Sequence, residues 1–98
     1  MKNIPTELLR TFTTIVDLGG FTLAGALLGR SQPAISLQVK RLEDLLGIRV
    51  FQRNNGLQVT EEGEVLLGFA RRMLDINDSA VTRLAKSRIS GQVRLGIP

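Results

Sequence analysis

The stretch SQPAISLQVKRLE, residues 31–43, combines a helix start with a narrow apolar stripe. Ser31 is a favourable N-cap, because its hydroxyl can accept a hydrogen bond from a backbone N–H of the first turn. Pro33 lacks only an N–H that would be unpaired in that turn. Apolar side chains then recur every three or four residues, so one face of the helix is expected to be buried. This buried stripe consists of Ile35, Val39, Leu42 and Leu46. Gly47 is expected to end the helix.

The other face of this helix carries small and hydrogen-bonding side chains and almost no negative charge. At 100° per residue, positions 32, 36 and 40 form one row, with 33 and 37 beside it. Gln can bind adenine through N6 and N7, Ser can bind a base edge or a phosphate, and Lys can bind guanine or the DNA backbone. Pro and Leu suit thymine methyl groups or sugars. The candidate DNA-binding residues are Ser31, Gln32, Pro33, Ser36, Leu37 and Lys40.

Each of these residues also has an ordinary explanation. Ser and Pro are common at helix starts, which is enough to explain Ser31 and Pro33. The functional alternative for Ser31 is that it helps the backbone N–H groups of the helix start to bind a phosphate. Gln32, Gln38 and Lys40 could simply be solvated surface side chains. The surrounding elements therefore decide between the two interpretations.

Two shorter helices are expected before this stretch. Pro5 suits the first turn of one helix, and Gly19-Gly20 ends it; its core positions are Leu8, Leu9, Phe12, Ile15 and Val16. Thr22 is expected to cap the second helix through its hydroxyl, and Gly29 to end it. The side chains expected to point inward from the second helix are Leu23, Ala24, Leu27 and Leu28. Gly25 within this helix indicates either a close helix crossing or a tolerated local weakness.

A β-hairpin is expected at about residues 49–60. The segments VFQR and LQVT alternate partly in polarity and are joined by NNG, whose Asn-Gly step favours a tight turn. Arg53 and Asn54 fall at the tip. Arg53 could enter a minor groove or bind a phosphate, or could merely keep the tip soluble. Two helices joined by a short Gly-containing turn and followed by such a hairpin have the layout of a winged helix-turn-helix.

A long helix is expected from Thr60 to Gly91. About 28 helical residues would span roughly 42 Å, which is too long for a domain of this size to cover. Its apolar band contains Leu66, Phe69, Ala70, Met73, Leu74, Ile76, Ala80, Val81 and Leu84. We expect a homodimer through this helix, and the alternative is packing within a larger chain. The predicted dimer interface is Ala70, Met73, Leu74, Ala80, Val81 and Leu84. The segment QVRLGIP after Gly91 resembles a strand without a partner.

Composition favours an anionic partner. The net charge is +4 over 98 residues, and most of the excess lies before residue 60, where seven basic and four acidic side chains occur. The chain has no Cys and no His, which excludes thiolate, imidazole and the usual zinc chemistry, so neither an enzyme nor a metal site is expected. Without an apolar run of 18 residues or a signal-peptide pattern, we expect a cytoplasmic protein and no membrane partner.

Five motifs in order resemble one family. The elements F-T-x-A, S-Q-P-A-I-S, R-L-E-x-x-L-G, V-F-x-R and T-x-E-G are similar to the N-terminal signature of the LysR-type transcriptional regulators. The resemblance implies a mainly α fold: a winged helix-turn-helix at 1–59 with its helix-turn-helix at 21–40 and a two-stranded β wing at 49–60. It further implies a linker helix at 60–89 that pairs antiparallel with its twin. Residues 90–98 would begin a truncated effector domain.

The resemblance also assigns roles to residues. DNA contacts are implied for Gln32, Pro33, Ser36 and Leu37, with Arg53 in the wing. Leu37 departs from the Arg that many family members have there, and Gly25 replaces the more usual Ala. Family members commonly form dimers, with tetramers in the full-length protein, and their effector domain usually binds a small co-inducer. No cofactor is expected for the residues present.

The expected function is that of a dimeric, sequence-specific regulator of transcription. It would bind double-stranded DNA at a roughly palindromic operator. One alternative is a winged-helix module that binds another protein without specific DNA binding. Another is nonspecific nucleic-acid binding through charge alone.

Overall fold

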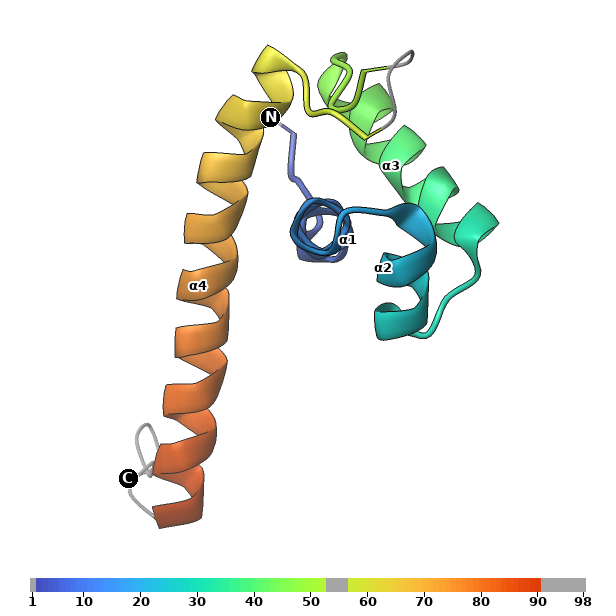
Figure 1. Ribbon diagram of the computed structural model, residues 1–98. Helices are drawn as coiled ribbons and strands as arrows, with labels where there is room; N and C mark the ends of the chain where they lie inside the picture. Colours follow the sequence, from blue (N-terminus) through green and yellow to red (C-terminus); the bar gives the residue numbers. More distant parts are fainter. Residues whose placement is uncertain (1, 53–56, 91–98) are drawn as a thin grey trace.

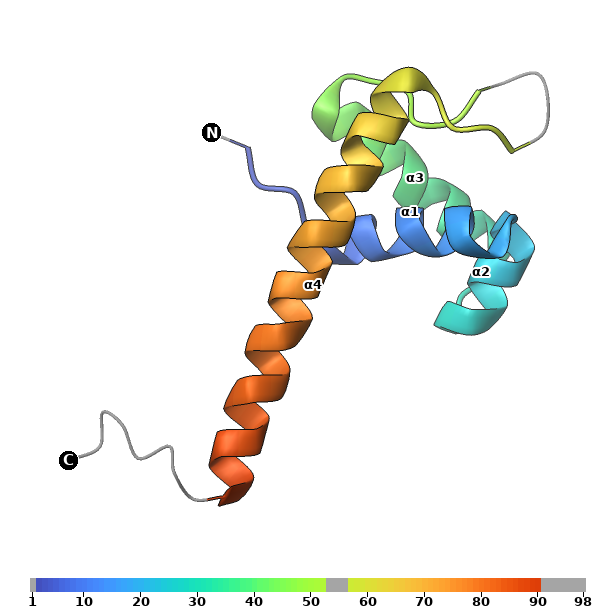
Figure 2. The same ribbon diagram turned by 60° about the vertical axis from the view of Figure 1, so that its left-hand side comes forward.

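The computed structural model describes residues 2–52 and 57–90, which form helices around one apolar core (Figure 1). The helices are α1 (Thr6–Leu18), α2 (Phe21–Leu28), α3 (Gln32–Leu46) and α4 (Glu61–Ser90). In Figure 1, α1 is seen end-on, with α4 on one side of it and α2 and α3 on the other. Figure 2 shows that the C-terminal half of α4 extends well beyond the other helices. The predicted mainly helical fold is confirmed.

The centre of the core is formed by α1. Leu9, Phe12 and Ile15 are completely buried, as their spacing predicts. The ring of Phe12 packs edge-on against Phe51, with ring centroids 5.5 Å apart. Burying each of these large side chains contributes about 1.5–3 kcal/mol. The helix therefore acts as the element on which the other three helices pack.

Two predictions for α2 are wrong. The helix begins at Phe21 with Gly20 as its N-cap, and no side chain caps it, so Thr22 is already inside the helix. Leu23 and Leu27 do not point inward, because they are 57% and 68% exposed. The inner side of α2 instead carries the buried residues Ala24 and Gly25, with Leu28 partly buried beside them.

The turn between α2 and α3 explains Gly25. A Cβ atom at this position would lie 2.6 Å from the carbonyl oxygen of Arg30 and 3.5 Å from Cγ1 of Ile35. The backbone N–H of Arg30 in turn donates a hydrogen bond to the carbonyl of Gly25, at 2.8 Å. Of the two explanations for this glycine, close approach is therefore the right one. The approaching group is mainly turn backbone rather than a crossing helix.

The boundaries and the buried stripe of α3 agree with the prediction. The hydroxyl of Ser31 accepts a hydrogen bond from the backbone N–H of Ala34, at 3.3 Å. Gly47 ends the helix in the left-handed conformation that glycine adopts most readily. The stripe faces the core: Ile35, Val39 and Leu42 are buried, and Leu46 packs against them while partly exposed.

The described part of the predicted hairpin is a short antiparallel pairing. Phe51 and Val59 form a β-bridge, and the N–H of Gln52 donates to the carbonyl of Gln58 at 2.7 Å. The rings of Phe21 and Phe51 lie 5.6 Å apart, so the first arm of the hairpin packs on α2 as well as on α1. The predicted tip residues, Arg53 and Asn54, lie outside the described residues, as does the strand predicted after Gly91.

The buried apolar side chains of α4 all lie in its N-terminal half, among the residues that the structure describes. Leu66, Ala70 and Leu74 are buried in the core. The prediction that Ala70 and Leu74 are available to a partner is therefore not supported, because the chain's own core already covers both side chains. Within residues 2–52 and 57–90, no helix is long and apolar enough to cross a membrane.

Candidate nucleic-acid interface

The predicted recognition residues share one exposed side of α3 and its N-terminus. Ser36 is half-buried and Leu37 is 49% exposed. The others are exposed: Ser31, Gln32, Pro33 and Lys40. The seventh predicted residue, Arg53, belongs to the part of the hairpin that is not described. The structure thus places six of the seven predicted residues and brings them together along one helix.

Gln32 and Ser36 form a hydrogen-bonded pair on this face. The Nε2 atom of Gln32 donates to Oγ of Ser36 across one helical turn, at 2.8 Å. A Gln amide has two N–H donors and a carbonyl acceptor, so one donor and the acceptor remain for a base edge. This is the set that binds N7 and N6 of adenine. The hydrogen bond to Ser36 therefore orients the side chain of Gln32 in the absence of DNA.

Lys40 carries a positive charge that a phosphate could use. Its Nζ lies 3.7 Å from Oδ2 of Asp44, one turn further along α3, and both side chains are largely exposed. Exposed pairs of this kind stabilise a helix by only a few tenths of a kcal/mol. An incoming phosphate can displace such a weak partner at little cost.

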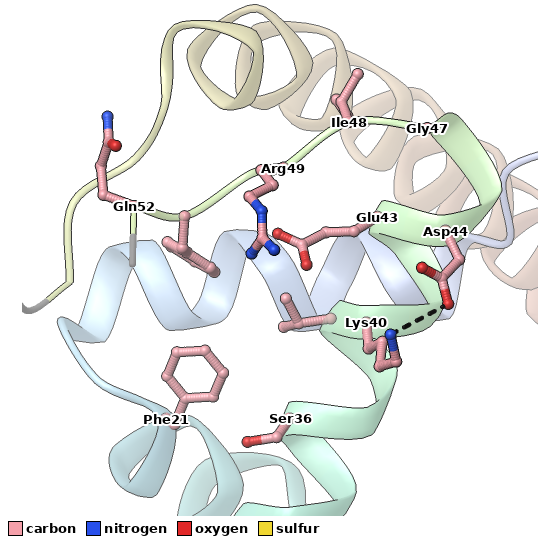
Figure 3. A pocket seen from close by; sticks show the side chains of 11 residues that line it. Phe21, Ser36, Lys40, Glu43, Asp44, Gly47, Ile48, Arg49 and Gln52 are labelled. Carbon is pink, nitrogen blue, oxygen red and sulfur yellow. Dashed lines mark ion pairs between the residues drawn. The ribbon is translucent and has the colours of Figure 1, made fainter. Parts of the chain in front are cut away.

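A groove runs between α3 and the segment that leads into the hairpin. Its volume is about 680 Å³, and Figure 3 shows the side chains around it. Lys40 and Arg49 contribute positive charge, and the side chain of Arg49 points toward Glu43. The carboxylate of Glu43 accepts a hydrogen bond from the backbone N–H of Val50, at 2.8 Å. Glu43 thereby holds this segment against α3.

Gln38 is the residue of this region that the sequence prediction placed wrongly. It is only 6% exposed, whereas we expected a solvated side chain. Its Oε1 accepts a hydrogen bond from the buried hydroxyl of Thr11, and its Nε2 donates to Glu7 at 3.3 Å. Glu7 also pairs with Arg30 in the turn before α3, at 2.6 Å. Gln38 therefore ties the recognition helix to α1.

The helical spacing contained a signal for this burial. At 100° per residue, position 38 falls about 60° from position 35 and about 40° from position 42, at the edge of the buried stripe. Because Gln38 is polar, we expected it to be exposed. A buried amide needs hydrogen-bond partners, and only the folded structure shows that Gln38 has them. The partners here come from α1, 27 and 31 residues away in the sequence.

Two ion pairs connect α1 to α4. Arg10 donates to both carboxylate oxygens of Asp78, and Arg71 donates in the same way to Asp17. The hydrogen bonds from these guanidinium groups lower the pKa of Asp78 and of Asp17 below the usual carboxyl value. Both pairs are well exposed to solvent, so each contributes little to stability on its own.

Comparison with known proteins defines the class of this chain. The family described as bacterial regulatory helix-turn-helix protein, lysR family, matches residues 6–64. The chain therefore belongs to the LysR family of bacterial helix-turn-helix regulators, and the resemblance seen in its motifs is confirmed.

Individual relatives give the extent of the likeness. The chain is 40% identical over 95 residues to the transcriptional regulator PecT of Dickeya dadantii (strain 3937), covering 96% of this chain and 30% of PecT. It is 38% identical over 98 residues to DgdR of Burkholderia cepacia, covering 99% of this chain and 33% of DgdR. The chain thus spans about a third of the length of these curated relatives.

The fold is similar to a DNA-binding domain solved with its target. The BenM DNA-binding domain in a complex with catB site 1 DNA superimposes with a TM-score of 0.81 and 29% identity. The match covers 87% of this chain and 96% of that one. Because nearly all of the BenM DNA-binding domain is matched, the two chains share almost the whole fold of that domain.

Proposed function

We propose that this chain is the DNA-binding end of a dimeric, sequence-specific transcriptional regulator of the LysR family. The observation that carries the proposal is the exposed face of α3, where Gln32, Pro33, Ser36, Leu37 and Lys40 lie together. α3 contains no acidic side chain before Glu43, so the N-terminal part of this face can approach the negatively charged major groove. The BenM domain, which has the same fold, was solved on DNA.

The side chains of α3 divide into two groups by chemistry. Gln32, oriented by Ser36, reads a base edge, with Pro33 and Leu37 giving apolar contacts to thymine methyl groups or sugars. Ser31 and Lys40 bind phosphates, together with Arg53 from the wing, and fix the position of the helix on the duplex. The first group determines sequence preference and the second group determines affinity.

The second part of the proposal is dimerisation through α4. Beyond the residues that pack in the core, α4 exposes large apolar side chains along its length, among them Phe69, Ile76 and Leu84. Such a continuous exposed apolar face on one helix is unfavourable in water and marks a contact with another chain. Two chains joined there would present two recognition helices to a roughly palindromic site.

The remaining parts of the proposal concern the whole protein. We place it in the cytoplasm, without an enzymatic activity of its own, because the relatives PecT and DgdR are transcriptional regulators. These relatives are about three times as long as this chain, so an effector domain that binds a small co-inducer is proposed for the full-length protein. Through this effector domain, the dimers of the full-length protein would associate into tetramers.

Titration of labelled duplexes tests DNA binding. Selection from a random pool supplies the preferred site, and binding to this site and to a random duplex is compared at two salt concentrations. We expect Gln32→Ala to cost about 1–3 kcal/mol on the preferred site and to relax the preference at one base position. Lys40→Ala should weaken binding to both duplexes equally. Arg83→Ala, which removes an exposed arginine from the C-terminal half of α4, is the matched control.

The same titration separates the alternatives. Equal affinity for every duplex would support binding by charge alone, and no binding at low salt would support a protein-interaction module. An unchanged base preference in Gln32→Ala would show that the recognition face lies elsewhere.

A further inference from the structure

One carboxylate oxygen on α1 contacts two separate points at the start of the recognition helix α3. Oε2 of Glu7 accepts a hydrogen bond from the guanidinium of Arg30 at 2.6 Å and another from Nε2 of Gln38 at 3.3 Å. Arg30 directly precedes Ser31, the N-cap of α3, and Gln38 lies about two turns further along the helix. Glu7 therefore holds both ends of the first two turns of α3 against α1.

These two turns carry the side chains that we propose for reading bases. Gln32, Pro33, Ser36 and Leu37 all lie between the two residues that Glu7 contacts. A hydrogen bond to a base edge needs a donor–acceptor distance of about 2.7–3.2 Å, so a shift of the helix by about 1 Å breaks it. The placement of this short segment thus determines whether a base can be read.

The two contacts of Glu7 differ in burial. The side chains of Arg30 and Glu7 are 45% and 59% exposed, and an ion pair at this exposure contributes little to stability. Gln38 is buried, and its Oε1 already accepts a hydrogen bond from Thr11. The orientation of this amide is therefore fixed with Nε2 toward Glu7. The exposed contact adds a second point of attachment to the buried one.

We propose that Glu7 is a positioning residue for the recognition helix and thereby sets how strongly the chain prefers one DNA sequence over another. The inference rests on the proposed function, because it assigns base reading to α3. Glu7 acts through Arg30 and Gln38 rather than on the DNA itself. It also holds the positive charge of Arg30 on α1. Once released, this charge can bind phosphates, which are the same in every sequence.

Titration of two duplexes tests this role. The measured quantity is the affinity for the site selected from a random pool divided by the affinity for a random duplex, here called the affinity ratio. Glu7→Ala removes both contacts. We expect its affinity ratio to fall about fivefold, the lower end of what losing one base contact costs. Binding to the random duplex should not weaken, because the substitution removes a negative charge and releases Arg30.

Asp17→Ala is the matched control. It also removes an acidic side chain from α1 and breaks an ion pair, to Arg71 at 2.7 Å, whose side chains are 48% and 53% exposed. That pair joins α1 to α4 and not to α3. The affinity ratio of Asp17→Ala should therefore equal that of the natural chain, although the change in net charge is the same as in Glu7→Ala.

Two further variants separate position from charge. Glu7→Gln keeps the length of the side chain and one oxygen that can accept from both partners, so it should retain most of the affinity ratio. Arg30→Ala leaves the buried contact to Gln38 and should lower the ratio by a smaller factor than Glu7→Ala. The double variant should match Glu7→Ala, because that substitution alone already breaks the contact to Arg30. Any phosphate contact of Arg30 changes both affinities and cancels in the ratio.

Hydrogen exchange gives a local measurement without DNA. The backbone N–H of Ile35 donates to the carbonyl of Ser31 at 3.1 Å, within the segment that Glu7 holds. The N–H of Gly47 donates to the carbonyl of Glu43 at 2.7 Å, at the other end of α3. In Glu7→Ala we expect faster exchange at Ile35 and unchanged exchange at Gly47. A uniform increase along α3 would show a general loss of stability and would overturn the positioning role.

The titrations also overturn the proposal in defined ways. An unchanged affinity ratio in Glu7→Ala, or an equal fall in Asp17→Ala, would contradict it. So would a Glu7→Gln variant as poor as Glu7→Ala, since charge would then be responsible. If Gln32→Ala still relaxes the base preference in these cases, the proposed function remains and only the role of Glu7 fails. A natural chain without preference for any duplex would instead contradict the proposed function itself.

Discussion

The guanidinium of Arg10 on α1 holds both carboxylate oxygens of Asp78 on α4, at 3.2 and 2.9 Å. A second pair with reversed polarity, Asp17 on α1 with Arg71 on α4, has distances of 2.7 and 3.3 Å. The partners are seven residues apart on each helix, and the order is antiparallel. Sliding α4 by seven residues would bring Arg10 beside Arg71. The two pairs therefore disfavour that wrong register between the helices.

These pairs should make part of the stability depend on acid pH. Because the pKa values of Asp17 and Asp78 are lowered in the folded state, their contribution is present above about pH 4. It is lost as the pH falls through the folded-state values. We expect Arg71→Met to lower the free energy of unfolding at pH 7 by at most about 1 kcal/mol, since the pair is well exposed.

Urea unfolding at pH 7 and near pH 3 measures this dependence. The difference between the natural chain and Arg71→Met should shrink at the lower pH. Arg41→Met, which removes an exposed arginine from α3, is the control and should change stability little at either pH. An equal loss for Arg71→Met at both pH values would show that the side chain acts through packing rather than through charge.

The buried bond between Thr11 and Gln38 predicts a strongly non-additive pair of substitutions. Gln38→Leu leaves the buried hydroxyl of Thr11 without its acceptor, and we expect a loss of about 1–3 kcal/mol in the free energy of unfolding. Adding Thr11→Val removes the unpaired hydroxyl and should recover most of the loss. Denaturant unfolding of the two single variants and the double variant measures the coupling. Additive losses would contradict a specific role for this bond.

Helix length explains much of what could be read from the sequence. In α3, fifteen residues give four apolar positions in one narrow arc, and the predicted buried stripe was right. In α2, the four side chains predicted to point inward spread over about 140°, and periodicity alone cannot choose between them. Packing against α1 and α3 decides: Ala24 and Leu28 face inward, and Leu23 and Leu27 face outward.

The candidate sites show a similar division. The exposed residues of the proposed recognition face could be predicted from the sequence. They lie outside the clear buried stripe of α3, and their side chains can hydrogen-bond base edges. In α4, the predicted apolar band combines two faces, one covered by the chain's own core at Ala70 and Leu74 and one exposed at Phe69 and Ile76. The spacing of apolar residues indicates which side chains are buried, but it does not indicate whether the same chain or a second chain buries them. Only the folded arrangement separates the two faces.

Leu37 offers a prediction about affinity. It is 49% exposed on the proposed recognition face and carries no charge there. We expect Leu37→Arg to strengthen binding to DNA and, if the new side chain reaches a phosphate, to increase the salt slope by about 1. Leu27→Arg, on the outer side of α2, adds the same charge elsewhere and is the matched control. Equal gains from both substitutions would show that net charge alone is responsible.

Gly63 predicts a steric effect at the start of α4. A Cβ atom there would lie 2.5 Å from the carbonyl oxygen of Val50 and 2.6 Å from Cγ1 of Val59, so the first turn of α4 packs directly on the hairpin. Gly63→Ala should destabilise the chain by about 1–3 kcal/mol, because the crowding exceeds the gain in helix propensity. Gly68→Ala is the matched control, since nothing lies within 4 Å of the added atom. It should raise the free energy of unfolding by up to about 1 kcal/mol. A stabilising Gly63→Ala in urea unfolding would mean that the hairpin shifts freely on α4, contrary to the hydrogen bonds that Thr60 makes with Arg49 and Gly63.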